Sequence, residues 1–196
     1  MITTKDANLT ERKIKTTLDG DEHIPHNIVD RSSPLLPFVR FLDINGDGSG
    51  NTLANGDYSS SQGVFYIQPG AGEVLEIIRL VAFIQDSASW NLEHYGNLAA
   101  ALTTGIRIKA TVNSVVSFLD GGQPITQNGH WPRLTGRASG SDAGWGGGDD
   151  GAIASLELAS PLELIGDNSD KLEFTFDDDL TGLIDHRFCV HGRVVA

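Results

Sequence analysis

The chain has 196 residues, of which 39% are hydrophobic, and it carries 14 Lys/Arg against 26 Asp/Glu, for a formal net charge of −12. This length suits one domain with a short appended segment, and it is long enough to bury a full core. The acidic balance argues against nucleic acid as a partner, because phosphates are repelled. A membrane is also excluded as a partner, since no apolar run approaches the roughly 20 residues of a transmembrane helix.

The first 40 residues differ from the rest in charge. They contain six basic and six acidic residues, whereas residues 41–196 contain eight basic and twenty acidic ones and carry the whole net charge of −12. Apolar residues are sparse near the N-terminus, and three prolines keep that backbone extended. We therefore expect residues 1–37 to form an extended arm and residues 38–196 to form the body. The arm is either a flexible tail or a segment that orders on a neighbouring subunit or another protein.

The body shows a series of short strand-like segments separated by turn residues. The β-branched stretch 73–85 is the most apolar, which predicts one long central strand. Residues 90–102 are expected to form a short helix or an ordered loop, and the glycine-rich stretch 136–151 an open surface loop. The other predicted strands are 38–42, 64–67, 105–112, 115–119, 124–126, 131–134, 153–158, 162–165, 172–176 and 188–195. Their number and spacing predict an all-β fold, a jelly-roll-like β-sandwich of two packed sheets.

A polar loop at residues 43–51 marks the junction between arm and body. Gly48 and the alternating polar side chains match the first half of a calcium-binding loop. A helical EF-hand is excluded, because Ala54 occupies the twelfth position, where a bidentate Glu is needed. Two interpretations remain: a calcium loop completed by backbone carbonyls and Asp57, or a glycine-rich turn whose side chains cap their own backbone. The alternating candidate ligands are Asp43, Asn45, Asp47 and Ser49.

Nothing in the sequence demands an enzyme. The close pair of histidines at positions 23 and 26 lacks partners at zinc spacing. Cys189 is the single cysteine, which excludes an intrachain disulfide and is expected to be a buried small hydrophobe. The run Asp177–Asp179 contains the carboxylates that a glycosidase would need, but a polar turn between two strands explains it more simply.

Several stretches together resemble a family of proteins. Residues 15–30 resemble an N-terminal segment that recurs in virion proteins of tailed bacteriophages, and the remainder resembles a family of small phage structural proteins. The matching stretches of the body are 40–50, 55–59, 65–69, 95–97 and 178–183.

The resemblance implies a virion component without catalysis. Within that class we expect a jelly-roll capsid decoration (cement) protein, a homotrimer made in the host cytoplasm. Such a protein clamps neighbouring major capsid subunits on the outer capsid surface. No cofactor is required, although calcium is compatible with the loop at residues 43–51. The arm residues expected to contact the capsid or another subunit are Ile24, Pro25, His26, Ile28 and Val29.

An alternative within the same class is a receptor-binding or tail-fibre-associated module. The tryptophans fall in predicted loops, where an indole ring stacks on a sugar or fills a subunit interface. In this alternative, Trp131 and Trp145 would contact host glycans.

Overall fold

In a computed structural model, the chain divides into two units, Met1–Pro34 and Leu35–Ala196. The boundary lies three residues before the one predicted from the sequence. The structure describes residues 2–5, 11–14, 16–19, 22–25, 36–86, 91–96, 98–137 and 150–195.

The first unit contains two β-hairpins. Strand β1 (Ile2–Lys5) pairs antiparallel with β2 (Glu11–Ile14), and β3 (Thr16–Asp19) pairs antiparallel with β4 (Glu22–Pro25). In the first hairpin Ile2 stands opposite Ile14, and Lys5 stands opposite Glu11. The arm predicted from its prolines as a single extended segment therefore forms local strand pairs in its described residues.

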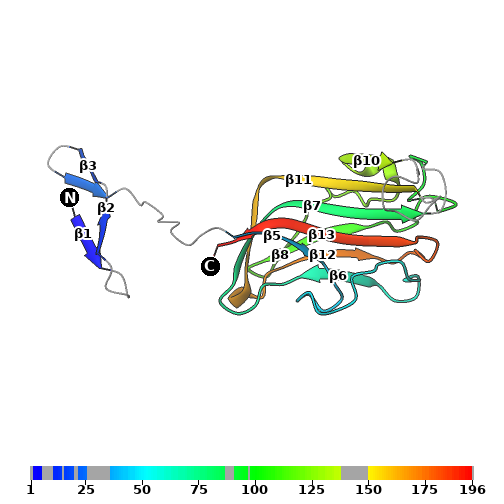
Figure 1. Cartoon of the computed structure of the whole chain (residues 1–196), viewed down its shortest axis with the longest axis horizontal. Helices are drawn as coiled ribbons and strands as arrows, with labels where there is room; N and C mark the ends of the chain where they lie inside the picture. Colours follow the sequence, from blue (N-terminus) through cyan, green and yellow to red (C-terminus); the bar gives the residue numbers. More distant parts are fainter. Residues whose placement is uncertain are drawn as a thin grey trace. The chain divides into compact units, whose positions relative to one another are not determined.

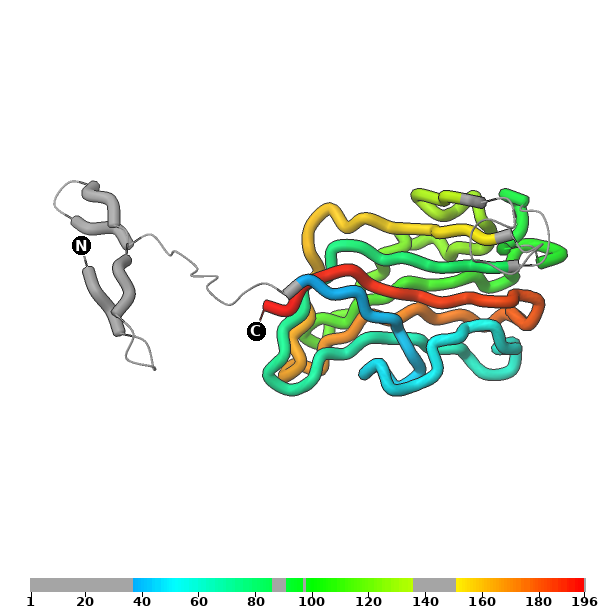
Figure 2. The backbone as a smooth tube through the Cα atoms, in the orientation of Figure 1, coloured from blue at the N-terminus to red at the C-terminus, as the bar shows by residue number. Residues whose placement is uncertain are grey.

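The second unit consists of two antiparallel sheets, which Figures 1 and 2 show as two layers. Its strands are β5 (Leu36–Phe41), β6 (Gly63–Ile67), β7 (Val74–Asp86), β8 (Arg107–Val112), β9 (Val115–Phe118), β10 (Arg133–Arg137), β11 (Asp150–Ile165), β12 (Lys171–Phe176) and β13 (Asp185–Val194). The five-stranded sheet has the order β10-β11-β7-β13-β5, and the four-stranded sheet has the order β6-β12-β8-β9. Without β10, each sheet has four strands, and the chain alternates between the sheets except at the hairpin β8-β9, as in a jelly roll. The predicted fold class is confirmed.

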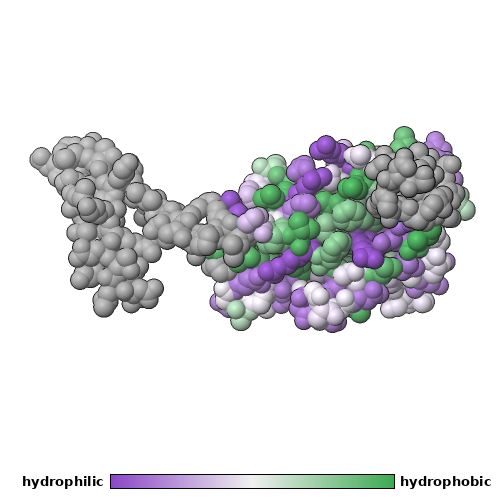
Figure 3. All heavy atoms as spheres, viewed as in Figure 1, coloured by the Kyte–Doolittle hydropathy of each residue, from purple (hydrophilic) through white to green (hydrophobic). Residues whose placement is uncertain are grey.

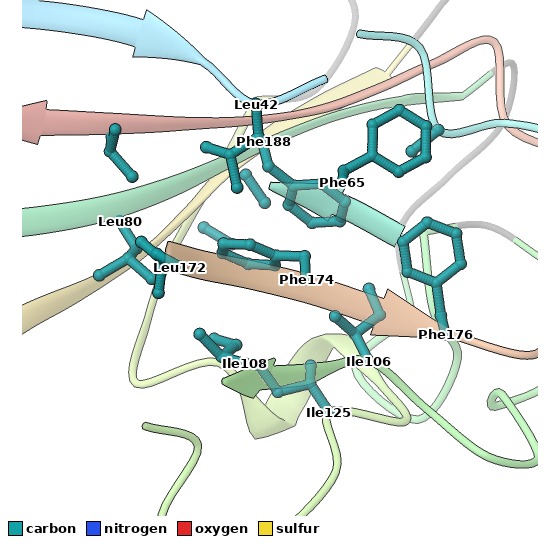
Figure 4. Packing of buried hydrophobic residues seen from close by; sticks show 14 of the residues in the cluster. Leu42, Phe65, Leu80, Ile106, Ile108, Ile125, Leu172, Phe174, Phe176 and Phe188 are labelled. Carbon is teal, nitrogen blue, oxygen red and sulfur yellow. The ribbon is translucent and has the colours of Figure 1, made fainter. Parts of the chain in front are cut away.

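The core lies between the two sheets and contains a cluster of buried phenylalanine rings among leucine and isoleucine side chains. Figure 4 shows side chains from both sheets pointing toward one another. The five-stranded sheet contributes Leu80 and Phe188, and the four-stranded sheet contributes Phe65, Phe174 and Ile108. The rings of Phe174 and Phe188 stack with centroids 4.1 Å apart. Burying each such side chain contributes about 1.5–3 kcal/mol. Period-two alternation produces this layer, since alternate residues of β6 are buried.

The strand prediction was correct for the long central strand. It was wrong at residues 124–126, where only an isolated bridge between Ile125 and Ile106 forms, and at the split of residues 153–165 into two strands. Strand β7 lies between β11 and β13, as its Val/Ile content predicted. The two segments 153–158 and 162–165 form one strand, β11, with a register shift between Glu157 and Leu162. The turn signal of Pro161 marks a β-bulge, which accommodates a residue without an N–H inside a strand.

We predicted a short helix or an ordered loop for residues 90–102 and an open loop for residues 136–151. Residues 91–96 and 98–102 form turns and bends, so the ordered-loop alternative describes them better than a helix. Of the expected glycine-rich loop, residues 138–149 lie outside the described residues. Within the described part of the chain, no helix is long and apolar enough to span a bilayer.

Candidate functional site

The loop at residues 43–51 is organised by one buried carboxylate. Asp43 is fully buried, and its carboxylate accepts hydrogen bonds from the backbone N–H groups of Asn45 (3.1 Å), Gly46 and Gly50 (2.6 Å). Gly46 has a φ of 80° and lies against the ring of Tyr66, so a side chain would fit neither the backbone nor the space. The Asp43 side chain thus holds the loop closed, as expected for a glycine-rich turn with its own caps.

The remaining predicted calcium ligands bond to their close neighbours. The carboxylate of Asp47 accepts from the N–H of Ser49 (2.9 Å), and the amide of Asn45 donates to the Ser49 hydroxyl (3.1 Å). Asp57 lies in the next loop and accepts from the N–H and hydroxyl of Ser59. Hydrogen bonding by the hydroxyl and the N–H of Ser49 lowers the pKa of Asp47, and hydrogen bonding by the hydroxyl and the N–H of Ser59 lowers the pKa of Asp57. The described residues contain no group of three acidic, His or Cys side chains able to hold a metal, and calcium binding stays a prediction.

A hollow of about 370 Å³ opens beside this loop, between it and the turn that precedes β7. Arg40 and Glu73 line it and form an ion pair with a distance of 2.6 Å. The hydrogen bond from Arg40 lowers the pKa of Glu73. Because Arg40 and Glu73 neutralise each other, neither residue offers an unpaired charge to a ligand in this hollow.

The three aspartates at residues 177–179 serve three different contacts. The buried carboxylate of Asp178 accepts from the N–H groups of residues 103–105 at 2.7–3.2 Å. Asp179 accepts from the N–H and hydroxyl of Thr181, and Asp177 accepts from the amide of Gln62 (3.1 Å). The three side chains therefore hold loops and do not face one another as an acid and a base, which favours the polar-turn interpretation.

The residues predicted to contact the capsid, another subunit or a glycan lie only partly within the described residues. Ile24 and Pro25 lie in strand β4, whereas His26, Ile28, Val29 and Trp145 lie outside the described residues. Trp131 is only 5% exposed and belongs to the core. Its ring therefore presents little surface on which a sugar would stack.

A polar pair inside the core was not predicted as a site. The Nδ1 atom of His186 donates to the carbonyl of Ala54 (2.8 Å), so its Nε2 atom accepts from the hydroxyl of Tyr95 (2.8 Å). Burial lowers the pKa of His186 to about 4 and raises the pKa of Tyr95 well above its usual range. The neutral pair ties the loops around residues 54 and 95 to strand β13.

The outward side of the five-stranded sheet, which we call the sheet face, is unusually apolar. Pairing of Phe41 with Cys189, Cys189 with Val81, and Ile153 with Phe83 places these residues on the same side. Figure 3 shows apolar atoms gathered over this side of the sandwich. The exposed apolar residues are Val39 (58%), Phe41 (40%), Ile78 (46%) and Ile153 (38%).

The sheet face also contains a shallow hollow. It measures about 290 Å³ and is lined by Val39, Ile78 and His191, among others. Antiparallel sheets usually turn a polar face to water, and a contiguous exposed apolar patch marks a contact surface. The sequence signal for the apolar sheet face is the unbroken apolar run 80–84. This run lacks the apolar–polar alternation of a strand that has one face exposed to solvent.

Comparisons with protein-family models, with curated proteins and with solved structures find no match to this chain. We therefore infer its function from its own sequence and geometry.

Proposed function

We propose that this chain is a structural protein of a tailed-bacteriophage particle. Within the particle it acts as a decoration protein that clamps neighbouring major capsid subunits and stabilises the head. The observation that carries the proposal is the division into two units: a small hairpin-bearing N-terminal unit and a jelly-roll body with an apolar sheet face. Jelly rolls recur in viral capsid proteins, but fold alone does not fix function.

Two units joined in one chain suit a clamp. A protein that bridges two capsid subunits needs two contact regions, and joining them raises the effective concentration of the second contact. Strand β4, which contains Ile24 and Pro25, supplies candidate contacts in the first unit. The acidic body keeps a protein present in many copies soluble. The proposal includes a homotrimer and needs no cofactor; calcium at the Asp43 loop, which lies within the second unit and not at the boundary predicted from the sequence, would stiffen that loop.

Labelled antibodies on purified particles test this proposal. We expect label spread over the head, with particles from a deletion strain of the same phage as the unlabelled control. Label confined to the tail tip would contradict a capsid role and favour the receptor-binding alternative.

A further inference from the structure

The sheet face combines apolar groups with arginine. Arg79 pairs with Glu157, Arg187 pairs with Asp185, and Arg193 pairs with Glu76. Arg133, on the outward side of β10, is exposed and takes part in no ion pair within the described part of the chain. Arginine and aromatic residues are enriched at protein interfaces. On a chain of net charge −12, the sheet face therefore stands out as apolar and bears an unpaired cation.

A second surface of the same unit has the complementary character. The loops 52–62, 91–96 and 177–184 meet at one end of the sandwich, the right-hand end in Figure 1. Their contacts include the bridge between residues 57 and 179 and hydrogen bonds from Asn55 to the carbonyls of residues 183 and 184. We call this end the acidic loop end.

The acidic loop end carries apolar and acidic side chains but no Lys or Arg. Leu92 and Ile184 are exposed apolar residues on it. Asp57, Glu93 and Asp179 are exposed acids that join no ion pair within the described residues. Hydrogen bonds from Ser59 lower the pKa of Asp57, so this carboxylate is charged at neutral pH.

We propose that the sheet face of one copy binds the acidic loop end of a second copy. Such a contact would pack apolar groups against Val39 and Ile78 and bring carboxylates to Arg133. Pairing two identical sheet faces would cover the apolar groups but would leave Arg133 without an acidic partner from the loop end. Because the two surfaces differ, the contact is heterologous, and repeating it closes a ring when the rotation allows.

A mixing experiment tests the proposal on the purified full-length protein. The variant Val39→Asp/Ile78→Asp places charges at two exposed apolar positions of the sheet face and leaves the acidic loop end unchanged. The variant Leu92→Arg/Glu93→Arg disrupts the loop end at two exposed positions and keeps the sheet face. Sedimentation velocity should show an oligomer for the wild type and a monomer for each variant, with self-association weakened at least about tenfold. An equimolar mixture of the two variants should form a dimer and nothing larger, because only one productive contact remains.

A matched control uses the exposed apolar strand of the other sheet. Val115 and Val116 of β9 are exposed to a similar extent, and Val115→Asp/Val116→Asp should leave the oligomer intact. The single variant Arg133→Glu tests the charge without touching the apolar groups, and it should weaken association in the same direction. Raising the salt from about 0.15 M to 1 M should also weaken association, since exposed charges are then screened.

Three results would overturn the inference: a wild type that sediments as a monomer, a mixture that forms no dimer, or a β9 control that dissociates as readily as the sheet-face variant. None of them depends on where the protein sits in a particle. Labelling at the tail tip would therefore contradict the proposed head location without contradicting the contact between copies. A monomeric wild type would contradict that contact without contradicting the head location.

Discussion

His186 is the residue on which two loops of the body depend. It lies on β13, yet its two ring nitrogens bond to Ala54 and Tyr95, which come from separate loops. The faces and edges of its ring pack against Phe176 and Phe188. Among these contacts Tyr95 is the titratable side chain, and burial keeps it neutral. A charged imidazolium has no carboxylate partner among them.

Acid should therefore destabilise the protein through His186. Burial lowers its pKa to about 4 in the folded state, from 6.5 for an exposed histidine, so the unfolded chain binds more protons between these values. The stabilisation is complete above about pH 6.5 and is lost as the pH falls toward 4, to a total of about 3 kcal/mol. Urea unfolding at several pH values measures the slope.

A variant isolates this residue from the carboxylates that also titrate. His186→Gln should be less stable at pH 7 but should lose less stability between pH 6.5 and 4 than the wild type. His130→Gln, at an exposed position, should keep the wild-type slope. Equal slopes for the wild type and His186→Gln would refute the assignment.

For single residues, the sequence pointed to the positions that matter but did not determine their roles. The spacing of Asp43 and Asp47 fitted both a metal loop and a capped turn. The structure shows that the Asp43 oxygens accept backbone hydrogen bonds. Tyr95 and His186 are 91 positions apart in sequence, and no local pattern connects residues that only the sandwich brings together.

At the scale of strands and loops, buried aspartates fix the connections. Asp170 accepts from the N–H groups of Asn113 (2.7 Å) and Ile165 (3.0 Å). Asp120 receives the side chain of Arg107 and two backbone N–H groups. Together with Asp43 and Asp178, they show that part of the chain's acidity serves loop geometry. Each carboxylate gives two acceptor oxygens to donors that lack a strand partner.

The role of Asp178 in holding the loop at residues 103–105 can be tested by comparing its substitution with that of Asp177. Asp178→Asn replaces one acceptor oxygen by an NH₂ group that faces the N–H donors of residues 103–105. We expect a loss of about 2–3 kcal/mol in the free energy of unfolding, measured by chemical denaturation. Asp177→Asn changes a partly exposed side chain with one amide partner, and it should cost at most about 0.5 kcal/mol. Similar losses for the two variants would contradict the role given to Asp178.

The strands were predictable where their pattern was local. Alternation located β8, and a run of Val and Ile located β7. The split of β11 was wrong because Pro161 signals a turn in sequence, while pairing on both sides of the bulge continues the strand. The sheet face was not predicted, because its residues come from β5, β7 and β11, whose order in the sheet is not a local property.

For the whole molecule, the division into two units predicts independent folding of the body. Deleting residues 1–34 should leave the melting temperature within about 2 °C, since the core residues that the structure describes lie in the second unit. The deletion must stop there, because β5 begins at Leu36 and is paired with β13.

The same deletion tests the clamp. Losing one of two linked contacts should weaken binding to capsids lacking the protein by about a hundredfold or more. Co-sedimentation with such capsids measures it, with the full-length chain as reference. Undiminished binding of the shortened chain would show that the first unit is no part of the clamp.

The pairing of Val194 with Leu36 brings the entry and the exit of the body side by side, as Figure 1 shows. A short linker between them would close the body into a circle, and new ends could then be opened in an exposed turn, as in circular permutants. A cargo fused to the C-terminus would leave the body beside Leu36. It would thus lie at the end of the sandwich opposite the acidic loops, and those loops would remain free for contacts.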